Sequence, residues 1–241
     1  MIQRKSLIVS GLLAVLLGAS PGLCRAQLHG QEEPEPEAAS SEPAPATAPA
    51  AVPEPVAPVP TPPPAATQPV IIKTAMGDIT LALEIERAPI TAKNFLRYVD
   101  NKRYDGMTFY RGMKLDDEGK YGLVQGGIAG VPGKPFPPIA HESPLNTGLS
   151  HVSGAVSMAR GAPGTAVGDF FIVVGDLVSM DGNKDGSDPG YAVFAHVTSG
   201  MDVVRAILEL PKSQDARNPV MKGQMLAAPV KIISVRRAPA N

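Results

Sequence analysis

Eight short runs of β-branched, aromatic and other apolar residues occupy the C-terminal part of this chain, and clusters of glycine, proline or aspartate separate them. Runs of this length with such boundaries are typical of β-strands. Many short strands bury their apolar faces best in a closed antiparallel barrel or in a sandwich. The runs are VIIKTA, DITLALE, MTFYRGM, GLVQGGI, GAVSMAR, DFFIVVG, YAVFAHV and VKIISVRR, and they predict a mainly β domain over residues 70–238.

The first two runs and two further segments have clear local signals. A tight turn at Met76–Gly77–Asp78 joins VIIKTA to DITLALE and predicts a β-hairpin. The segment MDVVRAILEL, between Gly200 and Pro211, predicts a short helix. Another helix is predicted after the hairpin, with Thr91 as its N-cap. Its apolar residues near helical spacing are Ile90, Phe95, Leu96, Tyr98 and Val99.

One strand carries an unexpected cation. If MTFYRGM is extended, alternate side chains share a face, so Met107, Phe109, Arg111 and Met113 project together and Tyr110 points the other way. An arginine among methionines and an aromatic residue either pairs with a nearby carboxylate, such as that of Asp116 or Asp117, or belongs to a site.

The N-terminus predicts export. The basic start MIQRK precedes the apolar run LIVSGLLAVLLGA, which is shorter than the roughly 20 residues of a membrane span. We therefore expect a secretory signal peptide over residues 1–26, a periplasmic or secreted mature protein, and no membrane span after cleavage. The alternative is a lipid anchor on Cys24, the only cysteine.

Residues 27–69 differ in composition from the rest of the chain. Thirteen of the 26 prolines lie here, among alanine, glutamate and threonine and without any aromatic residue. Such a segment buries too little apolar surface to offset the entropy of ordering. It is predicted to be a disordered linker.

Composition and motifs argue against several functional classes. The formal net charge is -1, so the basic excess typical of nucleic-acid binders is absent. The histidines His29, His141, His151 and His196 have no zinc-site spacing, and no GxSxG elbow is present. Ser150, His151 and Ser153 are close in sequence, which is not the geometry of a catalytic triad. We expect no metal and no cofactor.

A turn near the C-terminal third resembles the start of a calcium loop. Asp181, Asn183, Asp185 and Gly186 follow the pattern D-x-[DN]-x-[DN]-G, but the twelfth position is Ala192 instead of glutamate. Aspartate and glycine also favour turns for backbone reasons alone. A surface turn is the favoured interpretation.

Several strings together resemble a known family. APITAKNFLRYV, YDG, FYR, VQGG, SMAR, DFFI, YAVFAHV and GMDVV occur in the order in which cyclophilin-type peptidyl-prolyl cis-trans isomerases have them, over roughly residues 70–237. The resemblance implies a closed eight-stranded antiparallel barrel capped by two helices. It further implies proline-containing polypeptide substrates and no cofactor. With no long apolar seam, we expect a monomer.

The resemblance also implies roles for individual residues. Arg111 of FYR corresponds to the principal catalytic residue, Gln125 of VQGG to a glutamine that bonds a substrate carbonyl, and Phe171 of DFFI to the aromatic floor of the proline pocket. Alternation in DFFIVVG places Phe171 and Phe170 on opposite faces. The further residues expected to bind substrate are Leu123, Ala159, Arg160, Gly161, Asp169, Met180 and Tyr191.

Two departures from the family pattern bear on activity. The segment 112–124 between Arg111 and Gln125 is longer than usual, and its insert KLDDEGK is expected beside the groove, where it could gate access. Asp169 stands where a glutamine is common, which brings a negative charge to the site.

Three functional hypotheses follow. The first is an exported isomerase that assists protein folding through Arg111. The second is a non-catalytic proline-peptide-binding module or chaperone on the same fold. The third is a structural platform whose proline-rich linker is the interacting element.

Overall fold

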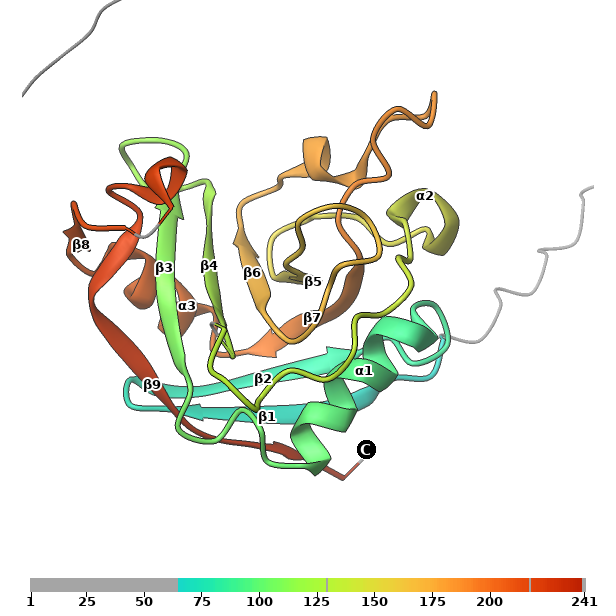
Figure 1. Cartoon of the computed structure of the whole chain (residues 1–241), viewed down its shortest axis with the longest axis horizontal. Helices are drawn as coiled ribbons and strands as arrows, with labels where there is room; N and C mark the ends of the chain where they lie inside the picture. The colour runs from blue at the N-terminus through green and yellow to red at the C-terminus, as the bar shows by residue number, and fades with distance from the viewer. Residues whose placement is uncertain (1–64, 129, 217, 240–241) are drawn as a thin grey trace, which may run out of the picture. The chain divides into compact units, whose positions relative to one another are not determined.

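The computed structural model describes residues 65–128, 130–216 and 218–239. The predicted signal peptide lies outside the described residues, as does the predicted linker up to residue 64. In the described part, nine strands form one antiparallel sheet in the order β1-β2-β7-β5-β6-β4-β3-β9-β8. Strand β1 also pairs with β9, so eight strands close into a barrel and the two-residue β8 extends beyond β9 (Figure 1).

The eight predicted strands and two predicted helices appear in the predicted order, and α2, β8 and two 3₁₀ turns are additional to the prediction. The strands are β1 (Gln68–Thr74), β2 (Gly77–Leu83), β3 (Thr108–Lys114), β4 (Gly122–Gly127), β5 (Ala155–Met158), β6 (Phe170–Val174), β7 (Val193–Ser199), β8 (Lys212–Ser213) and β9 (Met225–Arg237). The helices are α1 (Pro89–Asp100), α2 (Pro144–Thr147) and α3 (Met201–Glu209), with 3₁₀ turns η1 (Val178–Asp181) and η2 (Pro219–Met221). The predicted mainly β, closed barrel is confirmed.

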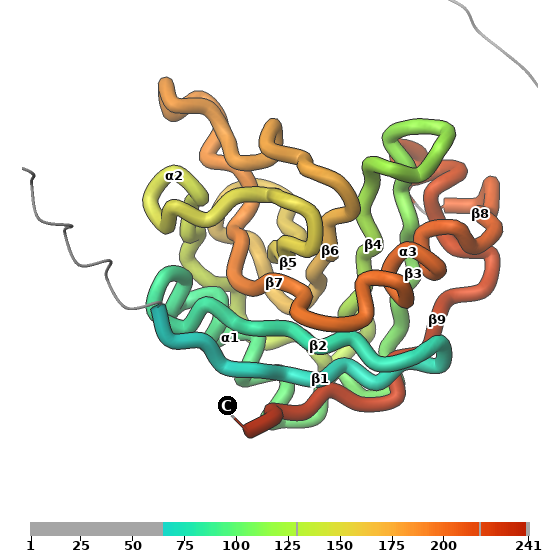
Figure 2. Tube along the Cα trace, turned by 180° about the vertical axis from the view of Figure 1, so that it is seen from behind, coloured from blue at the N-terminus to red at the C-terminus, as the bar shows by residue number. Residues whose placement is uncertain are grey.

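The structure places the first turn one residue earlier than expected. Gly77 pairs with Thr74, so Ala75 and Met76 form the connection. Thr74 Oγ1 closes the turn, because it donates to the Gly77 carbonyl at 2.7 Å and accepts from the Met76 N–H at 3.0 Å. Figure 2 shows β1 and β2 side by side, with β9 along the other edge of β1.

The expected N-cap of α1 is wrong. Helix α1 begins at Pro89 with Ala88 at the N-cap position, and Thr91 is buried inside the helix. Its first N–H groups are satisfied from a distant loop, because Glu142 accepts from the Ile90 N–H at 3.0 Å and from the Thr91 N–H at 2.7 Å. Ile90 is 44% exposed and belongs to this outer face, whereas the other predicted apolar residues of the helix are buried.

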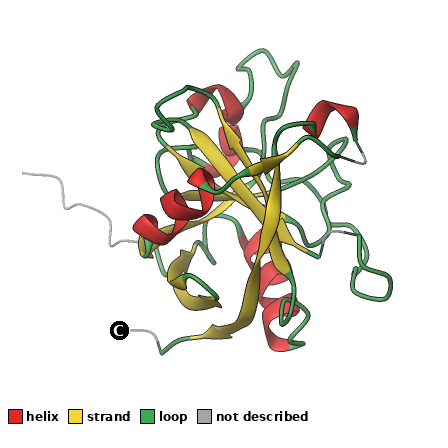
Figure 3. Cartoon of the chain, turned by 90° about the vertical axis from the view of Figure 1, so that its left-hand side faces the viewer, coloured by secondary structure: helices red, strands yellow, loops and turns green. Residues whose placement is uncertain are grey.

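An aromatic cluster fills the barrel interior. The Phe95 ring of α1 lies 5.1 Å from Phe194 and 5.4 Å from Phe170, measured between ring centroids. Phe170 in turn meets Phe109 edge-on at 5.8 Å. Helix α1 packs against β7 and β9, and α3 packs against β2, β3, β4 and β6. Figure 3 shows the strands at the centre and the helices and loops around them.

None of the helices in residues 65–239 that the structure describes is long and apolar enough to cross a membrane.

Candidate functional site

A row of side chains crosses the outer face of the sheet. In the strand register, Arg111 of β3 lies opposite Gln125 of β4, Gln125 opposite Phe171 of β6, and Phe171 opposite Ser157 of β5. Residues directly opposite each other on neighbouring strands point to the same face. The three principal predicted residues, Arg111, Gln125 and Phe171, therefore lie side by side on one face of the barrel.

A β-bulge changes the arrangement of β3. Phe109 pairs with Gly126 and Arg111 with Gln125, so Tyr110 and Arg111 together oppose a single residue of β4. The strict alternation expected for this strand is wrong. Phe109 enters the core, and Tyr110 joins the site with Arg111, because its hydroxyl bonds to Gln125.

The guanidinium of Arg111 is held by neutral acceptors. Its Nη1 donates to Gln125 Oε1 at 2.8 Å, while Nε and Nη2 donate to Gln224 Oε1 at 2.9 and 2.5 Å. Nη2 also approaches the Met113 sulfur at 3.3 Å. Of the five N–H groups of an arginine, the second N–H of Nη1 has no acceptor among the described residues. Neither Asp116 nor Asp117 pairs with Arg111.

From Gln125 the hydrogen bonds continue to a carboxylate. Gln125 Nε2 donates to the Tyr110 hydroxyl at 2.8 Å, and that hydroxyl donates to Asp169 Oδ1 at 3.3 Å. Burial and the charge of Asp169 raise the pKa of Tyr110, so the hydroxyl keeps its proton at neutral pH. In this series of hydrogen bonds, each donor points away from Arg111 and toward Asp169.

Gly127 makes room for this contact. Its backbone has a φ of +131°, and a Cβ atom there would lie 2.7 Å from the Asp169 Cα. Only glycine tolerates both conditions without strain. The glycine of VQGG at this position thus lets β4 pass close to Asp169.

Phe171 is fixed by aromatic contacts. The Tyr191 ring meets it edge-on at 5.5 Å between centroids, and the His151 ring is nearly parallel to it at 6.1 Å. Phe170 faces the core instead, as the alternation in β6 predicts.

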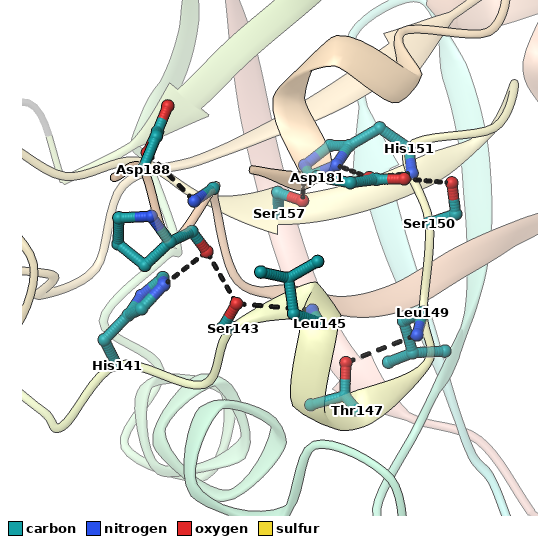
Figure 4. A network of polar contacts seen from close by, with 12 residues as sticks. His141, Ser143, Leu145, Thr147, Leu149, Ser150, His151, Ser157, Asp181 and Asp188 are labelled. Carbon is teal, nitrogen blue, oxygen red and sulfur yellow. Dashed lines mark hydrogen bonds and ion pairs between the residues drawn. The ribbon is translucent and has the colours of Figure 1, made fainter. Parts of the chain in front are cut away.

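The His151 ring, which lies parallel to Phe171, belongs to a chain of hydrogen bonds with Ser157 and Asp181, and Figure 4 shows this chain. His151 Nδ1 lies 2.5 Å from Asp181 Oδ1, and His151 Nε2 lies 2.8 Å from Ser157 Oγ. A carboxylate can only accept, so Nδ1 carries the proton and Nε2 accepts from Ser157. Burial lowers the pKa of His151, opposed by Asp181, which favours this neutral form. Ser150 also donates to Asp181.

Ser157, His151 and Asp181 are linked in the same order as the residues of a hydrolase triad. Unlike a catalytic serine, however, Ser157 is not accessible to a substrate. Ser157 and His151 are both fully buried. A catalytic serine must present its hydroxyl to a substrate carbonyl. This chain of hydrogen bonds therefore supports Phe171 structurally and is not a nucleophilic site.

The remaining predicted substrate residues lie on β4, on the segment that follows β5 and in η1. The Ala159 N–H bonds to the Asp169 carbonyl at 2.9 Å, and the Gly161 N–H bonds to Thr165 Oγ1 at 3.1 Å. Leu123 lies two residues before Gln125 on β4 and so shares its face.

The other two residues are tied to Tyr191. Arg160 lies over the Tyr191 ring at 4.7 Å and donates to the Gly190 carbonyl, so its side chain is turned toward this loop. Met180, in η1, accepts from the Tyr191 N–H through its carbonyl at 3.0 Å.

In the aspartate-rich turn over residues 181–190, the carboxylates of Asp181 and Asp185 bond to protein groups and are not arranged around a shared metal position. Asp181 bonds to His151, and Asp185 accepts from the Ser187 N–H and hydroxyl. At the far end of the turn, Ser143 Oγ donates to the Pro189 carbonyl at 2.7 Å (Figure 4). Within the described ranges, no group of three or more His, Cys, Asp or Glu side chains is placed to hold a metal ion.

The insertion in segment 112–124 forms a compact turn between β3 and β4. Asp116 accepts from the Lys120 and Tyr121 N–H groups at 3.2 and 3.1 Å. At its base, Lys114 pairs with Glu209 of α3. The Lys114–Glu209 pair thus joins the base of the insertion to α3.

Sequence reasoning missed two residues of the site. Alternation places Tyr110 on the opposite face, because a β-bulge leaves no signal in the alternation pattern. Gln224 lies 113 residues from Arg111, just before a strand that begins five residues earlier than the expected VKIISVRR. No local pattern marks it.

Comparison with known proteins agrees with this architecture. The family model described as "Cyclophilin type peptidyl-prolyl cis-trans isomerase/CLD" matches residues 69–236. A peptidyl-prolyl cis-trans isomerase of Acinetobacter baylyi is 37% identical over 175 residues, which cover 71% of this chain and 86% of the relative. Peptidyl-prolyl cis-trans isomerase A of Dickeya dadantii is 35% identical, over 58% of this chain and 71% of the relative.

The fold has solved counterparts. A crystal structure of a Cryptosporidium parvum cyclophilin-type isomerase, obtained in the presence of the dipeptide Ala-Pro, matches with a TM-score of 0.57. The match covers 72% of this chain and all of that protein, at 20% identity.

Proposed function

The chain belongs to the cyclophilin-type peptidyl-prolyl cis-trans isomerase family and is an isomerase of that type, and from this premise we propose that Arg111 catalyses the rotation. The substrate is a proline-containing polypeptide, bound on the face that carries Arg111, Gln125 and Phe171. The observation that carries the proposal is the one Nη1 N–H of Arg111 without an acceptor among the described residues, on a guanidinium otherwise held by Gln125, Gln224 and Met113.

Rotation about a prolyl bond needs no covalent chemistry. Resonance gives the C–N bond double-bond character and a barrier of about 18–20 kcal/mol. In the twisted transition state the nitrogen lone pair is no longer shared with the carbonyl and becomes a better hydrogen-bond acceptor. A donor aimed at that nitrogen stabilises the transition state more than either planar ground state, which is the condition for catalysis.

Arg111 suits this role in charge and in rigidity. Burial lowers its pKa, with Tyr110 and Tyr191 opposing, yet a guanidinium stays protonated in proteins. Because Gln224 and Gln125 are neutral, they fix the guanidinium without neutralising its charge. A fixed donor loses little entropy when it engages the substrate.

The neighbouring residues supply binding. We assign Phe171 as the floor of the proline pocket, held in place by Tyr191 and His151. Gln125 uses one Nε2 hydrogen on Tyr110, which leaves the second for a substrate carbonyl. The backbone of Ala159, Arg160 and Gly161 is assigned to pair with the extended peptide. In support, the Arg160 N–H has no acceptor within the described ranges.

The proposed clients are exported proteins, whose folding the enzyme assists in a periplasmic or extracellular space. This part rests on the basic and apolar N-terminal sequence over residues 1–26, which is typical of a secretory signal.

The test is a cis/trans exchange assay on a short Ala-Pro peptide, with the wild type, Arg111→Ala and Arg111→Lys. We expect kcat/KM to fall about a hundredfold in Arg111→Ala, which equals about 2.7 kcal/mol of transition-state stabilisation. Arg111→Lys keeps the charge but not the planar donors and should recover only part of the activity. If the wild type binds the peptide without speeding exchange, the non-catalytic binding module replaces this proposal.

A further inference from the structure

A second concavity adjoins the row of catalytic candidates. It has a volume of about 1150 Å³ and is bounded by Tyr110 and Asp169 on one side and by the segment from Ser213 to Pro229 on the other. Met225, on its wall, lies directly opposite Arg111 in the register of β3 and β9. The pocket is thus continuous with the site through Tyr110 and Met225, but it does not include Phe171.

The described lining of this pocket is mainly apolar. Two methionines, a leucine and two prolines dominate it, together with the Tyr110 ring: Pro219, Met221, Met225, Leu226 and Pro229. Met221 and Met225 are partly exposed, whereas most large apolar side chains of the domain are buried. Methionine side chains are flexible and polarisable, and they adapt to occupants of different shape.

The polar lining residues are compatible with a peptide. Ser213, Gln214 and Asn218 contribute side chains that bond neutral donors and acceptors. The charged side chains among the described lining residues are two carboxylates, Asp169 and Asp215, and one ammonium, Lys222, so the lining carries charges of both signs. An apolar occupant fits this lining better than a charged one.

We propose that this pocket is a subsite for a large apolar side chain, aromatic or aliphatic, carried by the substrate polypeptide close to its proline. The inference rests on the proposed function for the orientation of the substrate across Arg111. Pockets of about 300–1,000 Å³ hold drug-sized ligands, so this one can take a whole side chain with part of its main chain. Removal of that side chain from water is the source of the preference.

The proposed subsite also adjoins Gln224, the residue that helps to hold the Arg111 guanidinium. Gln224, whose Oε1 accepts from Arg111, immediately precedes Met225 and follows Met221 by three residues. Gln224 Nε2 donates to the Val220 carbonyl at 3.1 Å within the same turn. An occupant packed on Met221 and Met225 therefore covers the segment that carries this acceptor and excludes water from it.

The test compares short peptides in which one of the two positions that flank a proline carries Phe, Leu or Ala. In the wild type we expect kcat/KM to be about tenfold higher for Phe or Leu than for Ala at one position. Met221→Ala should reduce this ratio to about threefold or less. Val220→Ala is the matched control, because Val220 lies in the same 3₁₀ turn, is 79% exposed and does not line the pocket, and it should keep the wild-type ratio.

A second variant keeps the test valid if Met221→Ala does not fold. Ala216→Phe places an aromatic ring in the pocket and should abolish the preference while thermal melting shows a folded domain. A ratio that stays at tenfold in both Met221→Ala and Ala216→Phe, or a wild type without any preference, overturns the subsite.

Binding measured in the Arg111→Ala background separates the two proposals. In one outcome, peptides bind Arg111→Ala with the wild-type preference for Phe or Leu, but neither protein speeds exchange. The subsite then stands and the proposed function fails. If the wild type catalyses exchange equally for all peptides, the proposed function stands and the subsite fails.

Discussion

Two donors of Arg111, Nε and Nη2, converge on one oxygen, Oε1 of Gln224, at 2.9 and 2.5 Å. The two residues are 113 positions apart in sequence and meet because β9 enters the barrel beside β3. Gln224 is itself oriented, since its Nε2 donates to the Val220 carbonyl. The guanidinium is thereby positioned from two sides, by Gln125 and by Gln224.

Gln224→Ala should weaken catalysis more than binding. Without Oε1, Nε and Nη2 lose their acceptor and the guanidinium samples other orientations, so we expect kcat to fall about tenfold, or about 1.4 kcal/mol. KM should change little, because Phe171 and the backbone of Ala159 to Gly161, which we propose pairs with the peptide, are untouched. Exchange kinetics on an Ala-Pro peptide check this. An equal loss in Val220→Ala, whose backbone carbonyl is retained, would mean that the turn as a whole and not the Gln224 side chain matters.

The buried His151 predicts how stability depends on pH. Burial lowers its pKa in the folded state, so below about pH 6.5 the unfolded chain binds a proton that the folded domain does not. The free energy of unfolding should therefore fall as the pH drops below about 6.5, by at most about 1.4 kcal/mol per pH unit from this group.

Denaturant unfolding between pH 7.5 and 5.5 measures that slope. His151→Gln keeps a polar side chain but removes the titrating group, so its curve should be flatter than that of the wild type. Val152→Ala, at an exposed neighbour, should retain the wild-type slope. Identical slopes in all three proteins would contradict the assignment to His151.

Glu142→Ala should destabilise the domain without changing its activity. The carboxylate accepts from two N–H groups at the start of α1 and from Thr91 Oγ1 at 2.6 Å. Loss of a helix cap costs about 1–2 kcal/mol, which lowers Tm by roughly 2–4 °C per kcal/mol in a domain of this size. Thermal unfolding measures the change. Glu86→Ala, an exposed carboxylate near the same helix, serves as the control and should leave Tm almost unchanged.

The insertion between β3 and β4 should have little effect on turnover. Its turn is closed by Asp116, and residues 116–119 line neither the pocket bounded by Tyr110 and Asp169 nor the smaller one that Met113 and Gln224 line. We expect replacement of residues 116–119 by a shorter glycine-containing turn to leave kcat/KM within about twofold. A rise of several-fold in kcat/KM would show instead that the insertion gates the groove.

The sequence by itself determined the class of fold and predicted which three residues form the centre of the proposed site. Short β-branched runs between glycine and proline clusters predicted the strands. Helical spacing predicted α1, and the flanking Gly200 and Pro211 bounded α3. All of these signals are local in the sequence. The motifs FYR, VQGG and DFFI predicted Arg111, Gln125 and Phe171 as site residues, and the register of β3, β4 and β6 places these three in one row.

Only the tertiary structure decided how these residues are supported. The bulge that turns Tyr110 toward Gln125 depends on pairing between strands, and it reverses what alternation predicts. The contacts of Arg111 with Gln224, and of α1 with Glu142, join segments far apart in the chain. Such contacts are fixed by strand register and loop closure, which no local period encodes, because they exist only once the barrel has closed.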